Sequence, residues 1–276
     1  TYNIVQCTGV GTLSLVLRTN NIFDAKQFGA TGDGSTDDTG ALIALALNLP
    51  ASGGTINIPA GTYIMDGAEQ FGMLFSSKTN FVINGNNSTI KVADGAALVA
   101  DGVIMWFLNC TDGEINDLIL DGNRATRTPA ESAGAHCVAL RDGNFDLTFN
   151  NVRFINAVTD GLYIATANAN LGVAEKTATD ITLNNCIADN CYRNGVSPIN
   201  SLRFKVQGGQ YINTTGTNPQ TGIDLEDNGT AGNVDSVIDG ALFAGNSGSG
   251  VTFTGVFGCT NPIIRNSEFK DNAENG

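Results

Sequence analysis

The chain has few basic residues, no long apolar run and a single histidine, and each shortage excludes a class of function. Lysine and arginine total 14 against 27 aspartate and glutamate, which gives a net charge of −13. This balance argues against binding to nucleic acid or anionic membranes, because such binding depends on basic patches. No apolar run reaches the ~18 residues that a membrane-spanning helix needs, so we expect no membrane insertion.

Metal ligands are also scarce. His136 is the only histidine, and none of the 6 cysteines occurs in a CxxC motif. The spacing therefore predicts no zinc site. Cys186 and Cys191 flank one short expected strand, which leaves a disulfide open as an alternative to buried thiols. We favour thiols, since cysteine packs well in an apolar core.

What the second half does contain is a degenerate repeat. Each unit has a strand-like run, an asparagine, a turn of variable length, and usually a glycine followed by alternating aliphatic residues. The steps between the asparagines are 34, 23, 33 and 26 residues, which is the range of a solenoid. The repeated asparagines are Asn156, Asn190, Asn213, Asn246 and Asn272.

The apolar spacing within each unit is two residues, as in the pairs Leu162/Ile164 and Ile223/Leu225. That is the period of a strand with one buried face, whereas helical repeats have a period near 3.6. We predict an all-β fold, a single-stranded right-handed parallel β-helix, because parallel crossovers are almost always right-handed. The asparagines are expected to form a ladder of amides from coil to coil.

The segment 28–65 predicts a cap for this solenoid. Asp37 and Asp38 are N-cap candidates for a short apolar helix over 41–49, which Pro50 ends. Strands are expected at 55–58 and 62–65. A helix at the open end of a β-helix protects apolar surface and unpaired edges.

This opening, together with NDLILDGNR at 116–124, resembles the pectate-lyase-like superfamily of β-helices. Similar openings occur in mannuronan epimerases, rhamnogalacturonase-like enzymes and phage tailspike depolymerases. The resemblance covers residues 22–276 and implies the scaffold, whose members differ in chemistry. It implies that Asp37 and Asp38 cap the helix and are not catalytic.

The expected domain is residues 22–276, with residues 1–21 forming a strand or the end of a preceding domain. The sequence begins at Thr1 without a signal peptide, as a mature form or a fragment would. It ends where the next aliphatic strand is due, so we expect the β-helix to continue beyond residue 276.

Alternation along the strand after each repeat asparagine predicts which residues face outward. The best catalytic candidates are Asp224 and Glu226, whose backbones are expected about 6.5–7 Å apart on one strand. Glycoside hydrolysis uses two carboxylates, and this spacing slightly favours inversion of the anomeric centre. The alternative is a solvated acidic strand. The expected outward residues are Cys137, Ala139, Arg141, Tyr163, Ala165, Ser197, Ile199, Asp224, Glu226, Thr252 and Thr254.

Further residues are candidates for substrate binding near this pair. Asp227 follows in the turn as a third carboxylate or cation ligand, and we expect Trp106 in the core. A structural role for the lone histidine and for the arginines is the alternative. The substrate-binding candidates are Tyr163, Ser197, Asp227, Arg141 and His136.

The resemblance to mannuronan epimerases does not extend to their catalytic motif. Those enzymes carry Tyr, Asp and His within one short strand motif, and the corresponding stretch here is DGLYIAT at 160–166. Tyr163 matches it loosely, while that Asp and His are absent. The Gly-His-Gly and Arg-x-Lys pieces of polygalacturonase-like hydrolases are absent as well.

The leading hypothesis is an extracellular polysaccharide-recognising β-helix, a glycoside hydrolase of the tailspike or secreted kind. One alternative is a non-catalytic structural or adhesive segment of a phage tail fibre or surface protein. The other is a Ca²⁺-assisted lyase or epimerase acting on uronates. The leading hypothesis requires no cofactor and no metal, and it expects a secreted or virion-associated protein, a homotrimer if it is a tailspike.

Overall fold

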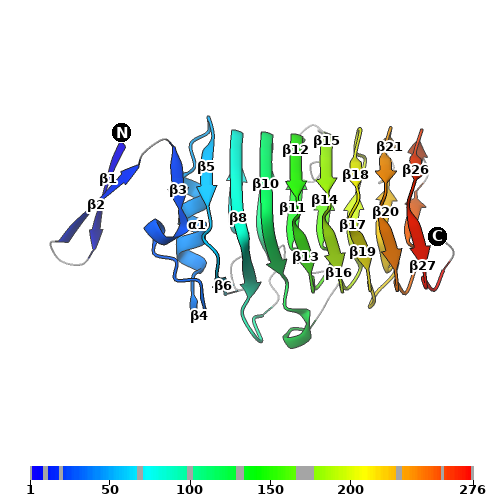
Figure 1. The fold of residues 1–276 in the computed structure, drawn as a ribbon, viewed down its shortest axis with the longest axis horizontal. Helices are drawn as coiled ribbons and strands as arrows, with labels where there is room; N and C mark the ends of the chain where they lie inside the picture. The colour runs from blue at the N-terminus through cyan, green and yellow to red at the C-terminus, as the bar shows by residue number, and fades with distance from the viewer. Residues whose placement is uncertain are drawn as a thin grey trace.

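The computed structural model describes residues 2–8, 12–18, 21–66, 71–97, 102–128, 134–165, 177–227, 232–255 and 258–274. Over these residues, neighbouring coils lie side by side along the long axis of the molecule (Figure 1). Their strands pair in parallel, and one short helix lies near the N-terminal end. The predicted right-handed parallel β-helix is therefore confirmed.

Seven strands form one wall of the solenoid, which we call the short sheet. They pair in the order β24-β20-β17-β14-β11-β9-β7, so each coil adds one strand to this wall. Their bounds are β7 Phe71–Ser76, β9 Val103–Leu108, β11 Val138–Arg141, β14 Leu162–Ile164, β17 Asn194–Pro198, β20 Thr221–Glu226 and β24 Val251–Thr254.

The remaining walls form a bent sheet of 16 strands, the long sheet, to which most coils contribute two segments. Toward the N-terminus its strands are β3 Ile22–Asp24, β4 Asp33–Asp37, β5 Gly54–Asn57, β6 Thr62–Met65, β8 Thr79–Val92 and β10 Thr111–Asp121. The later ones are β12 Phe145–Asn150, β13 Arg153–Ile155, β15 Thr179–Asn184, β16 Ile187–Asp189, β18 Lys205–Gln207, β19 Gln210–Ile212, β22 Val237–Asp239, β23 Leu242–Ala244, β26 Ile263–Arg265 and β27 Glu268–Lys270. Two short strands, β21 Asn233–Val234 and β25 Cys259–Thr260, pair separately.

The core consists of like residues stacked from coil to coil, because parallel pairing in register places each inward residue on its neighbour. Along the long sheet, Tyr211 stacks on Phe243 at 5.4 Å between ring centroids, and Phe243 on Phe269 at 4.9 Å. Phe75 and Phe107 of the short sheet stack at 4.9 Å. Such offset aromatic pairs stabilise the stack beyond the area they bury.

A column of glycines explains the glycine of the repeat. Gly161, Gly195, Gly222 and Gly250 lie just before or at the start of consecutive strands of the short sheet. A Cβ on Gly161, Gly195 or Gly222 would come within 2.5–2.6 Å of the carbonyl oxygen of the next glycine. Glycine is therefore required for close approach between coils rather than for turn geometry.

The repeat asparagines fall into two columns rather than the one that we predicted. Asn156, Asn190 and Asn213 occupy the left-handed corner that ends one segment of the long sheet, with φ of 52°, 55° and 56°. In the next two coils that corner is taken by Gly245 and Asp271, with φ of 66° and 54°. Asparagine, aspartate and glycine are the residues that tolerate this conformation.

Asn246 and Asn272 lie one residue later and point inward, so including them in the corner column was wrong. The amide of Asn246 donates to Tyr211 O at 3.0 Å and to Asn272 Oδ1 at 2.9 Å. Its oxygen accepts the backbone N–H of Thr214 at 3.0 Å. The two amides satisfy backbone groups that the bend leaves unpaired inside the solenoid.

The longest amide ladder lies on the outer face of the long sheet, among asparagines that we did not predict to form one. Asn116 donates to Asn84 at 3.3 Å, Asn150 to Asn116 at 2.8 Å and Asn184 to Asn150 at 2.8 Å. The four residues are paired in register on β8, β10, β12 and β15. The two inner members, Asn116 and Asn150, each donate one bond and accept one along the coil axis.

The N-terminal cap matches its prediction in outline. Helix α1 spans Thr39–Asn48 and buries Leu42, Leu45 and Ala46 against the first coils. Strands β1 (Tyr2–Thr8) and β2 (Thr12–Arg18) form an antiparallel hairpin before the first coil. The 3₁₀ turns are η1 (Ala25–Phe28) and η2 (Arg124–Thr126).

Asp38 occupies the N-cap position of α1, but its carboxylate does not cap the helix. It accepts the backbone N–H groups of Thr31 at 2.6 Å and Gly32 at 3.0 Å instead. Asp37 caps the first turn through the N–H and hydroxyl of Thr39. The prediction that both residues cap the helix is correct for Asp37 and wrong for Asp38, whose side chain accepts hydrogen bonds from the preceding loop.

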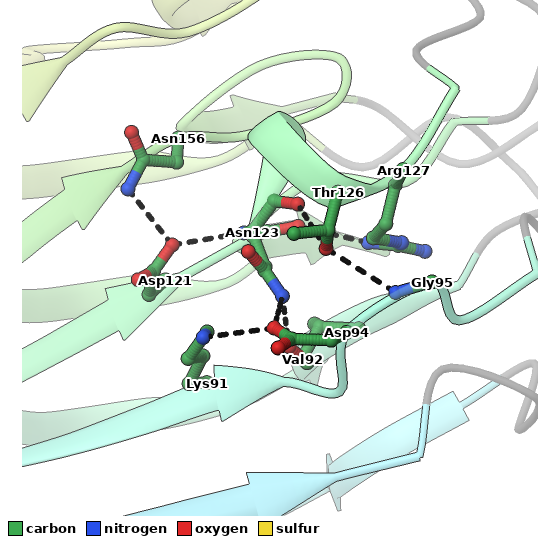
Figure 2. Close-up of polar contacts among 10 residues, drawn as sticks. Lys91, Val92, Asp94, Gly95, Asp121, Asn123, Thr126, Arg127 and Asn156 are labelled. Carbon is green, nitrogen blue, oxygen red and sulfur yellow. Dashed lines mark hydrogen bonds and ion pairs between the residues drawn. The ribbon is translucent and has the colours of Figure 1, made fainter.

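The DGN sequence at 121–123 fastens one coil to its neighbours. Asn123 adopts φ of 52° and donates its amide to Val92 O at 2.9 Å and to Asp94 at 2.7 Å (Figure 2). Asp121 accepts the Asn123 N–H and the Asn156 amide. The motif that carries the family resemblance therefore has a structural role: it forms hydrogen bonds to the coils on both sides.

The described cysteines are free thiols, which confirms the favoured prediction over a Cys186–Cys191 disulfide. Cys186 and Cys191 are buried and donate to different backbone carbonyls, those of Phe149 and Phe154. Burial raises the pKa of both thiols to about 12. The side chain of Cys7 lies outside the described residues, and no helix in the described segments is long and apolar enough to span a bilayer.

The asparagine ladder yields a stability prediction. In Asn150→Ala two ladder bonds are lost, whereas Asn184→Ala removes one. We expect the free energy of unfolding to fall by about 1–3 kcal/mol in the first variant and by about half as much in the second. Urea denaturation checks this, and equal losses would contradict a continuous ladder.

The outer face of the short sheet as a candidate functional site

Register in the short sheet brings together residues that lie far apart in the sequence. Ala139, Tyr163, Ser197 and Asp224 fall in one row across β11, β14, β17 and β20. Arg141, Glu226 and Thr254 fall in the row that lies two residues further along these strands. Their neighbours Leu140, Leu225 and Val196 belong to the core, so both rows face outward as the alternation predicts.

Cys137 is an exception to the predicted outward row. It precedes β11 and is buried in the core, where its thiol donates to Leu120 O at 3.4 Å. Strand alternation does not apply there because the chain is still in a bend. Burial raises the pKa of this thiol further, so Cys137 is a packing residue.

These outward residues are more buried than an open groove requires. Ser197 is 0% exposed, Asp224 2% and His136 5%, while Tyr163 and Glu226 are half-buried. Trp106 also lies on this face, in a small apolar cluster with Val103 and Ala139 that is separate from the main core. Trp106 is therefore buried among apolar residues as expected, in a second, smaller cluster on the outer side of the short sheet.

Aromatic rings and guanidinium groups alternate across this face. The Arg141 guanidinium lies 5.3 Å from the centroid of the Trp106 ring and 5.3 Å from that of Tyr163. The His136 ring stacks on Tyr163 at 4.5 Å with an interplanar angle of 1°. Arg193 lies 5.9 Å from the same ring. Cation–π contacts in a desolvated site hold such groups firmly.

A buried ion pair that the sequence did not suggest lies beneath Tyr163. Arg193 donates to both oxygens of Asp160, at 2.8 Å and 2.5 Å, in a bidentate pair. Asp160 is fully buried and also accepts the backbone N–H of Asn194 at 3.1 Å. One sequence feature could have pointed to this pair. Asp160 lies one residue before Gly161, and Arg193 lies two residues before Gly195, so both precede glycines of the same column.

The backbone of Asp160 orients His136. Its Nδ1 accepts the backbone N–H of Asp160 at 3.3 Å, so the ring is neutral with its proton on Nε2. Burial lowers the pKa of His136 to about 4, with Asp160 opposing the shift and Arg193 and Arg141 adding to it. A neutral, stacked imidazole supports the structural role that was the alternative to substrate binding.

The two candidate carboxylates differ in their surroundings. Asp224 Oδ1 accepts the Thr254 hydroxyl at 2.8 Å and Oδ2 the Asn194 amide at 3.2 Å. Burial nevertheless raises the pKa of Asp224. Burial and then the charge of Asp224 raise the pKa of Glu226. This arrangement gives two interacting carboxyl groups that release their protons at different pH values.

Asp227, the expected third carboxylate, turns away from the pair. Its Oδ2 accepts the backbone N–H of Gly258 at 2.6 Å, and it is 6% exposed. Among the residues that the structure describes, no three or more His, Cys, Asp or Glu side chains gather as a metal site would require. Asp227 therefore joins one coil to the next.

Comparison with known proteins finds one similar group of sequences and several structures with a similar fold. No protein-family model matches the chain. It is 28% identical over 268 residues to mannuronan C5-epimerase AlgE3 of Azotobacter vinelandii, which covers 92% of this chain. The chain spans 14% of the length of that epimerase.

Solved structures share the fold at low sequence identity. Bacteriophage phi29 gene product 12 matches with a TM-score of 0.68 and 15% identity, over 90% of this chain and 32% of that one. A putative glycosyl hydrolase from Parabacteroides merdae matches with a TM-score of 0.57 and 12% identity, over 90% and 95% of the two chains. The enzymatically active domain of bacteriophage CBA120 tailspike protein 2 matches with a TM-score of 0.56 and 15% identity, over 99% and 45%.

His136 yields a prediction on pH and stability. Its pKa is 6.5 in the unfolded chain and about 4 in the folded one, so the unfolded chain binds more protons between these values. Acid therefore destabilises the fold across that window. In His136→Asn, whose side-chain oxygen can still accept the Asp160 N–H, the fall in unfolding free energy should be shallower by about 1.4 kcal/mol per pH unit.

Urea midpoints measured from pH 7 to pH 4 test this expectation. The raised pKa values of Asp224 and Glu226 contribute with the opposite sign, since the folded state holds those protons more tightly. Both proteins carry that contribution, so it cancels in the comparison. Parallel pH profiles would show that His136 is not kept neutral by the fold.

Proposed function

We propose that this chain, a right-handed parallel β-helix similar in sequence to mannuronan C5-epimerases, is carbohydrate-active and cleaves a polysaccharide by hydrolysis. The observation that carries the proposal is the pair Asp224 and Glu226. Both face outward on β20, and the pKa of each is raised. Two carboxyl groups in one site, one protonated and one ionised, are what glycoside hydrolysis needs.

In this mechanism one carboxyl group gives its proton to the glycosidic oxygen while the bond from that oxygen to the anomeric carbon breaks. The other takes a proton from a water molecule whose oxygen bonds to the anomeric carbon. Each carboxyl group returns to its starting state by exchanging one proton with solvent. The backbone spacing of residues two apart on a strand suits a water between substrate and base, and therefore inversion.

The aromatic and cationic groups beside the pair support sugar binding at the same face. Tyr163 is half-buried on this face, and the Arg141 guanidinium lies 5.3 Å from the centroid of its ring. Aromatic faces stack on the apolar faces of sugars, and a guanidinium donates to hydroxyl or carboxylate oxygens. Arg141 and Tyr163 thus remain proposed substrate contacts, Ser197 lies between them and the acid pair, and Asp227 and His136 are assigned to the scaffold.

A uronate lyase or epimerase is the second candidate. It is favoured by the 28% identity to a mannuronan C5-epimerase and by the phenol of Tyr163 between His136 and two arginines. Such an enzyme neutralises the carboxylate and moves the proton at C5. Elimination leaves a 4,5-unsaturated sugar that absorbs ultraviolet light, and hydrolysis leaves none; loss of activity in EDTA would indicate Ca²⁺.

An enzyme of this kind meets its substrate outside the cell, and we propose a secreted or virion-associated protein. The fold likeness to phage gene product 12 and to a tailspike domain supports the second location. A tailspike would be a homotrimer, and light scattering of the purified chain measures this.

The catalytic assignment predicts the effect of removing either charge. Asp224→Asn and Glu226→Gln should each lower the rate of reducing-end formation on the cleaved glycan by about 100-fold or more, the contribution typical of an acid or base. Glu268→Gln, an exposed carboxylate on β27, is the matched control and should retain full activity. Full activity in both site variants on a panel of capsular and matrix glycans would refute the assignment.

A further inference from the structure

Asn194, which the sequence did not single out, contacts both halves of the candidate site. It is fully buried at the start of β17. Its backbone N–H donates to Asp160 at 3.1 Å, within the Arg193 ion pair. Its side-chain amide reaches Ser197 at 3.0 Å and Asp224 at 3.2 Å. It therefore links the buried ion pair to the acidic pair.

The orientation of this amide is fixed by chemistry. Asn194 Oδ1 accepts the backbone N–H of Thr221 at 3.1 Å, and a backbone N–H can only donate. The nitrogen of the amide must then face Asp224 and Ser197. A flipped amide would set nitrogen against the Thr221 N–H and oxygen against the Asp224 carboxylate. Both buried contacts would be repulsive.

Asp224 thus meets a donor at each oxygen, the amide of Asn194 at Oδ2 and the hydroxyl of Thr254 at Oδ1. Donors of this kind stabilise the ionised carboxylate. Each oxygen keeps a further lone pair that can accept the proton of a water. In the described residues, the Glu226 carboxyl group accepts no comparable hydrogen bond. Of the influences on its pKa, only the charge of Arg193 favours the ionised form.

We infer that Asn194 and Thr254 hold Asp224 as the ionised base, and that Glu226 is thereby the protonated acid. The inference rests on the proposed hydrolysis and assigns its two roles. Asp224 takes the proton from the attacking water, and Glu226 gives its proton to the glycosidic oxygen. Asn194 and Thr254 are positioning residues, since they act through Asp224.

The charges around the pair agree with this division. The charge of Asp160 raises the pKa of both carboxyl groups and that of Arg193 lowers both, whereas Asp224 and Asp227 further raise the pKa of Glu226. Arg193 donates two hydrogen bonds to Asp160. Its charge therefore acts on Asp224 and Glu226 from a distance and forms no ion pair with either. The hydrogen bonds of Asn194 and Thr254 favour the ionised form of Asp224 and have no counterpart at Glu226 in the described residues.

The test titrates the whole chain with ¹³C-labelled aspartate and glutamate carboxyl groups, followed by NMR. Asp224→Asn and Glu226→Gln assign the two resonances by their disappearance. We expect Asp224 to ionise at lower pH than Glu226. In Thr254→Val the Asp224 transition should move to higher pH. Thr252→Val is the matched control, because that hydroxyl contacts Thr221, and it should leave the transition in place.

Asn194→Ala should move the ionisation of Asp224 to higher pH, as Thr254→Val does. Because Thr254 is exposed, we expect the Thr254→Val variant to fold. Glu226 ionising first, or equal titrations in Thr254→Val and Thr252→Val, would overturn the inference. The titration needs no substrate. Correct ionisation order without cleavage of any glycan would refute only the proposed function, whereas cleavage with the reverse order would refute only the role assignment.

On a glycan that the chain cleaves, kinetics give a second readout. With Asp224 as base, the acid limb of the kcat profile follows its ionisation, so Thr254→Val should shift that limb to higher pH while KM changes little. A purely structural role for Thr254 would lower kcat at every pH without moving the limb.

Discussion

Register between coils is the constraint on which the rest of this molecule depends. Every strand of the two main sheets pairs in parallel with its neighbour, so each residue's environment is set by the residues at the same position one coil before and after. Four glycines keep consecutive coils close at the short sheet. At one corner of the long sheet, residues that tolerate positive φ turn the chain in five consecutive coils: Asn156, Asn190, Asn213, Gly245 and Asp271. Aromatic stacks, amide ladders and the candidate site are all products of this alignment.

The same constraint builds the site from distant pieces. Asp160, Asn194 and Asp224 come from three successive coils and lie within one chain of hydrogen bonds. The scaffold bears the desolvation of two buried acids by giving Asp160 a bidentate arginine and Asp224 two neutral donors. Burial raises the pKa of Asp224 and of Glu226, so the folded state disfavours the ionised form of both carboxyl groups.

Much of the fold was predictable because it follows from local patterns. Alternation at period two gave the strands, and the opening segment gave helix α1 and strands β5 and β6. The errors arose where residues are interchangeable or alternation does not apply. Gly245 and Asp271 occupy the corner in place of asparagine, so we assigned the next residues, Asn246 and Asn272, to the corner column by mistake. Cys137 lies in a bend before its strand, where alternation does not apply. The outer-face ladder through Asn150 was missed because those asparagines resemble turn residues.

The site was predictable only as a row of outward positions. Alternation found Tyr163, Ser197, Asp224 and Glu226, but not their burial, since burial depends on neighbours that only the assembled coils supply. Asp160, Arg193 and Asn194 lie before or at the start of their strands, where sequence gives no sign of what they contact. Their roles follow from hydrogen-bond partners 30 to 34 residues away.

We propose that a glycan lies across the outer face of the short sheet with its scissile bond at Asp224 and Glu226. The crystal structure of a Glu226→Gln variant with a bound oligosaccharide of the cleaved glycan is the sharpest test. We expect a glycosidic oxygen within hydrogen-bond distance of residue 226 and a sugar ring beside Tyr163. An oligosaccharide bound on the long sheet, away from this pair, would contradict it.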